Sequence, residues 1–272
     1  MMAGFYQKLE NIWKQNNSLV CVGLDPHLEK IPPHLLKKDR PIFEFNKGII
    51  DQTFDIVSCY KPQIAYYSAQ NAEDQLIDTI EYLRKKHPHI PIVLDSKRGD
   101  IGETAKMYAK ESFEHYKACA VTVNPYLGSE SLWPFLDYKD KGVIILCRTS
   151  NPSAAQLQDH SHNGELLFEK VARLCASEWN KNKNTALVVG ATYPEEIKKV
   201  RSLVGDIPLL IPGIGAQGGD LQKTVTSGLD SNGNGIMISS SRGIIYAGNG
   251  EDFAECSRSV VIKMNNEINK LR

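Results

Sequence analysis

Short apolar runs alternate with longer amphipathic stretches along almost the whole chain. The runs are rich in Val, Ile and Leu and predict strands buried on both faces, whereas the stretches between them repeat apolar positions at helical spacing. The predicted strands are residues 19–24, 56–60, 92–94, 118–123, 142–147, 185–189, 207–211 and 235–239. The predicted helices are residues 3–16, 43–54, 71–87, about 102–116, 129–136, about 165–179, from 194 onward, about 220–228 and from 251 onward.

This regular alternation predicts a parallel sheet with helices on its outside. Eight strand–helix units in a chain of 272 residues match the arithmetic of a (β/α)8 TIM barrel. Because no change of composition marks a boundary, we expect one barrel domain over residues 1–272. The alternative is an open doubly wound sheet, which the absence of a G-x-G-x-x-G motif after the first strand disfavours.

Composition narrows the possible partners and locations. Lys+Arg and Asp+Glu number 32 each, so the charge balance does not suggest a nucleic-acid or membrane partner. No apolar run approaches the roughly 18 residues of a membrane helix, and the N-terminal stretch carries charges that a secretory signal would lack. The six cysteines form no C-x-x-C pair and are expected to be free thiols. We therefore expect a cytoplasmic protein.

Polar and glycine residues follow the apolar runs at the predicted strand ends. In a barrel the carboxyl ends of all strands meet at one face, and that face carries the active site. Each residue alone has a structural explanation, such as a turn or a solvated strand end, but their convergence favours a functional site. The residues that this face would collect are Asp25, Lys61, Asp95, Lys97, Asn124, Ser150, Gly213 and Arg242.

The stretch 91–104, PIVLDSKRGDIGET, places several charges directly after the third predicted strand. Strand side chains alternate between faces, so Asp95 and Lys97 are expected to point the same way. Asp100 and Glu103 have the D-x-x-E spacing of a capping box and are expected to start the following helix. The local pattern thus predicts a carboxylate and an ammonium group side by side at the barrel face.

Lys61, Asp95, Lys97 and Asp100 would form an array of alternating charge at this face. Each charge has an opposite neighbour, which favours the ionised form of every group. A positioned ammonium group can stabilise negative charge that develops on a substrate and then deliver a proton. No Cys–His or Ser–His pairing is visible, and the seven histidines lie mainly in predicted loops and helix ends, so no catalytic metal is indicated.

The loops after the last two strands indicate a phosphate site. Residues 212–219 read PGIGAQGG and residues 241–243 read SRG. Glycine-rich backbone can present N–H groups to an anion, and Arg242 adds a fork of donors. Barrels frequently bind phosphate between these two loops, although a tight turn would also require glycine.

These residues together resemble the orotidine 5′-phosphate decarboxylase family, in its longer bacterial branch (the type 2 subfamily). The D-x-K-x-x-D hallmark of the family stands here as Asp95-Ser96-Lys97-Arg98-Gly99-Asp100. Further similar stretches are CYKPQIAYY, VNPYLG, RTSNPS, VVGATYP, PGIGAQGGD and SSSRGIIYA, in the expected order between about residues 18 and 250. The resemblance implies decarboxylation of orotidine 5′-phosphate to UMP and CO2 in pyrimidine synthesis, without a cofactor or metal.

The resemblance also implies a role for each site residue. Lys97 would protonate C6 of the pyrimidine, and Lys61, Asp95 and Asp100 would complete the charge network. A homodimer is implied, in which Asp100 and Thr104 act in the partner's site. The remaining implied contacts are Asp25 to the ribose, Ser150 and Gln217 to the pyrimidine, and Pro212, Gly213, Arg242 and Gly243 to the phosphate.

Some alternatives stay open at this point. Thr149 or Asn151 could contact the pyrimidine in place of Ser150. The segments 152–163 and 231–235 have no assigned role. A Mg2+-dependent sugar-phosphate lyase of the same superfamily shares D-x-K-x-x-D, but it lacks the 212–219 stretch as it stands here. A catalytically silent UMP-binding barrel is the other alternative, and it would not need the charge array.

Overall fold

The computed structural model describes residues 4–214 and 219–272. Its centre is a sheet of eight parallel strands in the order β2-β1-β10-β9-β8-β5-β4-β3. Parallel bridges from Tyr60 to Ile92 and from Gln63 to Asp95 join the outermost strands, β2 and β3, and so close the sheet. The fold is therefore the predicted (β/α)8 barrel, and the alternative of an open sheet is wrong. The barrel strands are β1 (Val20–Leu24), β2 (Cys59–Pro62), β3 (Val93–Arg98), β4 (Ala120–Val123), β5 (Gly142–Arg148), β8 (Thr185–Val189), β9 (Leu209–Pro212) and β10 (Ile236–Ser240).

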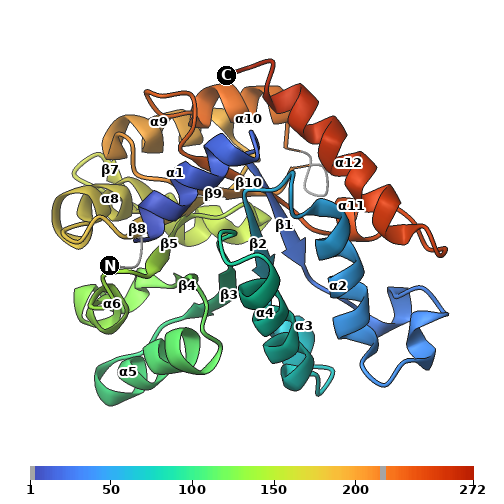
Figure 1. Ribbon diagram of the computed structural model, residues 1–272. Helices are drawn as coiled ribbons and strands as arrows, with labels where there is room; N and C mark the ends of the chain where they lie inside the picture. The colour runs from blue at the N-terminus through green and yellow to red at the C-terminus, as the bar shows by residue number, and fades with distance from the viewer. Residues whose placement is uncertain (1–3, 215–218) are drawn as a thin grey trace.

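Helices surround the strands, as Figure 1 shows. Two of them, α5 and α8, continue into single π-helical segments at Glu111–His115 and Cys175–Trp179. None of the described helices is long and apolar enough to cross a membrane. The helices are α1 (Phe5–Gln15), α2 (Pro41–Thr53), α3 (Ile64–Ser68), α4 (Glu73–Lys86), α5 (Gly102–Lys110), α6 (Ser129–Leu136), α7 (Ala155–Gln158), α8 (Leu167–Leu174), α9 (Pro194–Val204), α10 (Leu221–Gly228), α11 (Arg242–Ile245) and α12 (Phe253–Ile268).

The strands supply the core, and one end of the barrel is closed by α1. Strands β1, β2, β4 and β8 are buried at every position. This burial explains the mainly apolar sequences of β1, β4 and β8, whereas β2 also buries Lys61. The Tyr6 hydroxyl donates to the Thr185 carbonyl at the start of β8, at 2.6 Å. The Phe5 ring lies against Gly142 at the start of β5. Because α1 covers the amino ends of these strands, a substrate site is left to the carboxyl ends.

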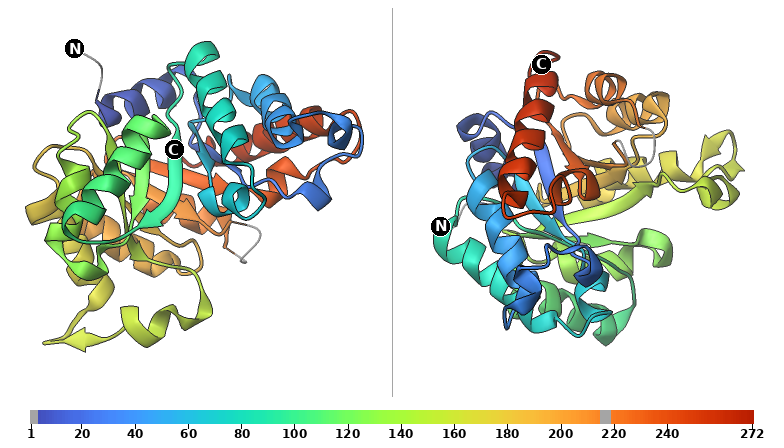
Figure 2. Two further views of the ribbon diagram at one scale, coloured as in Figure 1. Left: turned by 90° about the horizontal axis from the view of Figure 1, so that it is seen from below. Right: turned by 90° about the vertical axis from the view of Figure 1, so that its right-hand side faces the viewer.

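The structure differs from the sequence prediction at several boundaries. Strand β2 starts later than the predicted 56–60, because the Ile56 N–H still bonds to the Thr53 carbonyl at the end of α2. Residues 165–166 belong to a strand rather than to the predicted helix. Helices α3, α7 and α11 were not predicted, nor was the antiparallel hairpin of β6 (Ser161–His162) and β7 (Glu165–Leu166). Figure 2 shows this hairpin projecting from the body of the barrel, between β5 and α8.

Candidate active site

Three of the predicted charges meet at the carboxyl ends of β2 and β3. One carboxylate oxygen of Asp95, Oδ2, lies 2.9 Å from Lys61 Nζ, and the other, Oδ1, lies 2.7 Å from Lys97 Nζ. Lys61 and Asp95 are buried, whereas the Lys97 side chain is 44% exposed. The predicted placement of Asp95 and Lys97 side by side is therefore confirmed, although the backbone of Lys97 is left-handed rather than regular strand. The arrangement holds one ammonium group where a substrate can reach it, and fixes it through a buried ion pair.

At the ion pair, burial and the neighbouring charges shift the pKa values of Asp95 and Lys61 in opposite directions, and the charges have the larger effect. Burial alone would raise the pKa of Asp95, but the Lys61 and Lys97 ammonium groups together hold that pKa well below its usual range. Burial alone would lower the pKa of Lys61, but the charges of Asp95 and then Asp25 raise it above the usual lysine value. Both groups thus stay ionised near neutral pH, as the alternating array predicts.

Thr122 in β4 also joins this network, and the sequence analysis did not select it. Its hydroxyl donates to Asp95 Oδ1 at 2.9 Å and accepts the N–H groups of Ser96 at 3.0 Å and Lys97 at 2.9 Å. The one available signal was a hydroxyl residue within the apolar run 118–123, which is equally typical of a β-branched strand position.

Neither Asp100 nor Thr104, which lies in α5, bonds to the array within the described part of this chain. The predicted capping box at Asp100 and Glu103 is wrong, because α5 begins after Ile101, which has no side-chain cap. The Asp100 carboxylate accepts the neighbouring Ile101 N–H at 2.8 Å, and Glu103 pairs instead with Lys106. Among the described residues Asp100 forms no ion pair, so its own chain does not bring it to Lys61 or Lys97.

Asp25 directly follows β1, and its charge acts on Lys61 of the array. Its Oδ1 atom is buried and has no hydrogen-bond partner among the described residues. The Tyr246 hydroxyl holds the backbone here, since it donates to the Asp25 carbonyl at 3.2 Å and accepts the His27 N–H at 2.7 Å. A buried carboxylate oxygen without a partner is costly unless a ligand donates to it.

The ends of β9 and β10 carry the predicted phosphate residues. Gly213, which follows Pro212, has φ +107°, a backbone that favours glycine. After β10 the short helix α11 begins at Arg242, so its first backbone N–H groups lack intrahelical acceptors. Arg242 and Gly243 are both exposed. Gln217 lies outside the described residues.

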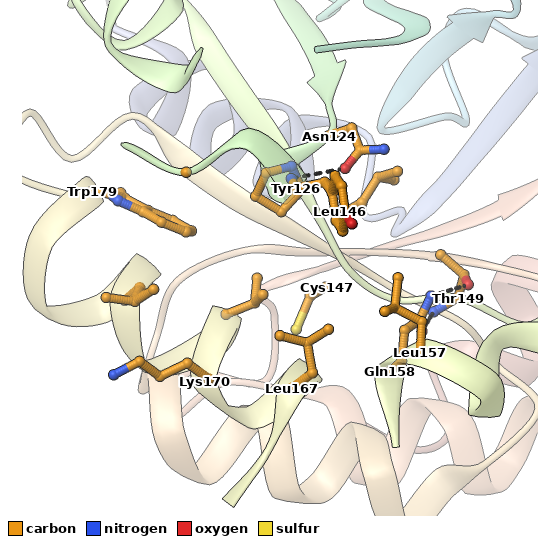
Figure 3. A pocket seen from close by; sticks show the side chains of 14 residues that line it. Asn124, Tyr126, Leu146, Cys147, Thr149, Leu157, Gln158, Leu167, Lys170 and Trp179 are labelled. Carbon is orange, nitrogen blue, oxygen red and sulfur yellow. Dashed lines mark hydrogen bonds between the residues drawn. The ribbon is translucent and has the colours of Figure 1, made fainter. Parts of the chain in front are cut away.

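The segment after β5 is clamped by the insertion that follows it. Gln158 of α7 accepts the Thr149 N–H at 2.8 Å and donates to the Thr149 hydroxyl at 2.7 Å (Figure 3). Thr149 donates in turn to Asn151 Oδ1 at 2.7 Å. Ser150 packs closely against Gly190 at the end of β8. Thr149 and Asn151 are thus engaged with the insertion and with each other.

Arg148, like Gln158, holds the segment after β5 in place. It is buried at the end of β5, and its guanidinium group binds both carboxylate oxygens of Glu196 at 2.7 and 2.8 Å. Its third nitrogen lies 2.6 Å from Asp159, directly after α7. One side chain therefore ties the β5 end to the insertion and to the first turn of α9.

A cavity of about 540 Å3 lies beside the β5 end (Figure 3). Its wall includes the Thr149–Gln158 clamp, the indole of Trp179 and apolar side chains of α8. Lys61, Asp95 and Lys97 do not line it. The charges that can act on a substrate are therefore at the barrel mouth and not in this cavity.

The candidate reactive groups among the described residues are the Lys61 and Lys97 ammonium groups. No group of three His, Cys, Asp or Glu side chains within residues 4–214 and 219–272 is arranged to hold a metal ion. All six cysteines carry free thiols. Lys97 carries the exposed ammonium group of the array, and Asp95 holds it.

The chain is similar to known proteins in both sequence and fold. The sequence model of the orotidine 5′-phosphate decarboxylase / HUMPS family matches residues 18–255. The chain is 55% identical over 268 residues to an orotidine 5′-phosphate decarboxylase of Dechloromonas aromatica (strain RCB), covering 98% of this chain and 99% of that protein. It is 53% identical over 270 residues to the protein of the same name from Cellvibrio japonicus (strain Ueda107), with 98% and 99% covered. Among solved structures, that of Leishmania donovani OMP decarboxylase superposes with a TM-score of 0.83 at 35% identity, covering 98% of this chain and 99% of that one.

Proposed function

Since the chain belongs to the orotidine 5′-phosphate decarboxylase / HUMPS family, we propose that it converts orotidine 5′-phosphate into UMP and CO2 in pyrimidine synthesis. The observation that carries this proposal is the Lys61–Asp95–Lys97 array at the barrel mouth. A carboxy-lyase of this kind needs a group that can stabilise and protonate a carbanion. A protein that only binds UMP has no need of a fixed ammonium group beside a buried carboxylate.

In the proposed reaction the bond between C6 of the pyrimidine and the carboxylate carbon breaks. CO2 leaves, and the electron pair of that bond stays on C6. The Lys97 ammonium group stabilises the developing negative charge and donates a proton to C6, and solvent then reprotonates the lysine amine. Asp95 holds Lys97 Nζ at 2.7 Å, so the positive charge is already in place when the carbanion forms. No metal or cofactor takes part in these steps.

The rest of the proposed site binds and orients the nucleotide. The buried, unpartnered Oδ1 of Asp25 suits a ribose hydroxyl donor. Phosphate binding at the ends of β9 and β10 lies far from the bond that breaks, so its free energy can serve to orient the substrate. The proposed contacts are Asp25 with ribose, Ser150 and Gln217 with the pyrimidine, and Pro212, Gly213, Arg242 and Gly243 with phosphate.

We also propose a homodimer in which Asp100 and Thr104 act across the interface. Asp100 has no ionic partner within the described part of its own chain, which leaves its carboxylate available to a partner's lysines. Apolar side chains are exposed near it: Ile101, directly before α5, is 50% exposed, Met107 of α5 63% and Trp133 of α6 36%. An exposed apolar patch of this kind marks an interaction surface. An isologous interface through α5 and α6 would bury it and bring each Asp100 towards the other subunit.

The test of the reaction uses purified protein and orotidine 5′-phosphate with EDTA present, followed by the ultraviolet change as UMP forms. We expect turnover by the wild type and a loss of several orders of magnitude, about 10^3-fold or more, in Lys97→Ala. Lys85→Ala is the matched control, because Lys85 is exposed and its one ion pair among the described residues is with Glu81 on the same helix. Turnover that requires Mg2+ would point to a sugar-phosphate lyase, and UMP binding without turnover would point to a silent barrel.

The dimer is tested by mixing inactive subunits. Lys97→Ala and Asp100→Ala protein should each be inactive alone. In a mixed dimer one site receives an intact Lys97 from one subunit and an intact Asp100 from the other. After random exchange about half of the dimers are mixed and each has one working site, so about one quarter of wild-type activity should return. No recovery after demonstrated subunit exchange would refute action across the interface.

A further inference from the structure

Thr122 is a buried hydroxyl residue at the centre of the charge network. It lies on β4, beside β3, and is 1% exposed. A threonine hydroxyl has one proton to donate and two lone pairs. All three are used here, because the oxygen accepts the backbone N–H groups of Ser96 and Lys97 and the proton goes to Asp95 Oδ1. The hydroxyl therefore has a single orientation, which the two N–H donors impose.

The same hydroxyl holds Lys97 in an unusual backbone conformation. Lys97 has φ +48°, in the left-handed region that L-residues rarely adopt. The pairing of β3 with β4 is irregular here and shifts between Leu94 and Arg98. Thr122 replaces the regular backbone partners, since its oxygen takes the two N–H groups that the irregularity frees. The direction in which Lys97 leaves the strand thus depends on this contact.

Thr122 and Lys97 also share one carboxylate oxygen. Asp95 Oδ1 accepts from Thr122 Oγ1 at 2.9 Å and from Lys97 Nζ at 2.7 Å. The other oxygen is held by buried Lys61 at 2.9 Å. Thr122 therefore fixes both ends of the Lys97 side chain: the backbone from which it starts and the carboxylate at which its ammonium group ends.

We propose that Thr122 is a positioning residue for the decarboxylation, one that sets the place of the Lys97 ammonium group relative to C6. This inference rests on the function proposed above. Thr122 acts through Lys97 and Asp95 and need not touch the nucleotide. Its removal should therefore impair the chemical step, which depends on Lys97, much more than it impairs binding, which depends on phosphate and ribose contacts.

The test compares Thr122→Val, which keeps the shape and removes the hydroxyl, with Thr122→Ser, which keeps the hydroxyl. We expect Thr122→Val to lower kcat about 10- to 100-fold, the effect of losing one charged hydrogen bond. KM for orotidine 5′-phosphate and Kd for UMP should change by no more than about 2-fold. Thr122→Ser should recover kcat to within about 3-fold of wild type.

Thr79→Val is the matched control. Thr79 is also fully buried, and its hydroxyl donates to the Gln75 carbonyl at 2.7 Å and accepts from Asn46 at 3.1 Å, on α4 outside the barrel. This variant should keep its kcat. If Thr122→Val does not fold, Thr122→Ala takes its place, because it puts no methyl group against the carboxylate.

Three results would overturn the inference. The first is a kcat of Thr122→Val within about 2-fold of wild type. The second is a joint loss of kcat and UMP affinity, which indicates general damage to the fold. The third is a serine variant no better than valine. If wild-type protein itself fails to turn over orotidine 5′-phosphate, the proposed function fails and this inference with it, and that outcome is visible before any variant is made.

Discussion

Asp95→Asn tests whether the buried charge of Lys61 depends on its partner. The change keeps the shape of the side chain and removes the negative charge 2.9 Å from Lys61 Nζ and 2.7 Å from Lys97 Nζ. The Lys97 side chain is 44% exposed and can regain water, whereas the Lys61 side chain is 7% exposed and cannot. Removing one partner of a buried ion pair costs about 3–5 kcal/mol. Because Asp25 still attracts Lys61, we expect the free energy of unfolding to fall by about 3 kcal/mol.

The pH dependence of the free energy of unfolding is a second, independent test of this ion pair. In wild type the pKa of Asp95 is lowered, so its contribution is complete above about pH 4 and is lost as pH falls through the folded-state value. The pKa of Lys61 is raised, so its contribution is complete below about pH 10 and is lost as pH rises through the folded-state value. Neither group changes the stability of wild type between about pH 6 and about pH 9.

In Asp95→Asn the effect of burial on Lys61 is no longer offset by Asp95. Its pKa in the folded state should then fall below the usual lysine value, so the folded protein binds fewer protons than the unfolded chain. Stability should rise with pH, by at most about 1.4 kcal/mol per pH unit.

The assay is urea unfolding followed by tryptophan fluorescence, from about pH 6 to about pH 9, at one protein concentration because a dimer's stability depends on it. Asp55→Asn is the matched control. Asp55 pairs with Arg258 at 2.6 Å, but their side chains are 44% and 32% exposed, so its loss should cost only about 0–1 kcal/mol and add no pH slope. An Asp95→Asn protein that is as stable as this control, with the pH slope of wild type, would refute the reasoning.

Three further substitutions test the segment after β5. Gln158→Leu removes both hydrogen bonds to Thr149 and should raise KM for orotidine 5′-phosphate about 10-fold; an unchanged KM would show that the clamp does not orient the site. Gly190→Ala would place a Cβ atom 2.7 Å from that of Ser150, so we expect the displaced serine to lower kcat/KM about 10- to 100-fold, and unaltered kinetics would exclude Ser150 from substrate contact. Arg148→Met removes two charged hydrogen bonds to Glu196 and an ion pair with Asp159, and should lower the free energy of unfolding in urea by about 2–3 kcal/mol, whereas a loss below about 0.5 kcal/mol would contradict its structural role.

Local sequence rules succeeded where one segment determines the outcome. The rule that strand side chains alternate predicted from spacing alone that Asp95 and Lys97 lie side by side. The left-handed backbone of Lys97 and its bond to Thr122 depend on the tertiary structure. The same kind of rule failed at Asp100 and Glu103. A capping box requires the Asp to sit at the N-cap with its side chain turned back over the first turn, and the path out of β3 places Ile101 there instead.

The sequence by itself determined the barrel, since each continuous apolar run must be buried on both faces and each is followed by a helix. It also determined which charged residues stand at strand ends, and hence the face at which they gather. Only the tertiary structure decided their partners. The bond from Thr122 to Asp95 spans 27 positions and that from Gln158 to Thr149 spans nine. Such contacts depend on strand register, barrel closure and the fold of an insertion. These arise from many weak interactions over the whole chain, so the local sequence around either residue does not predict the contact.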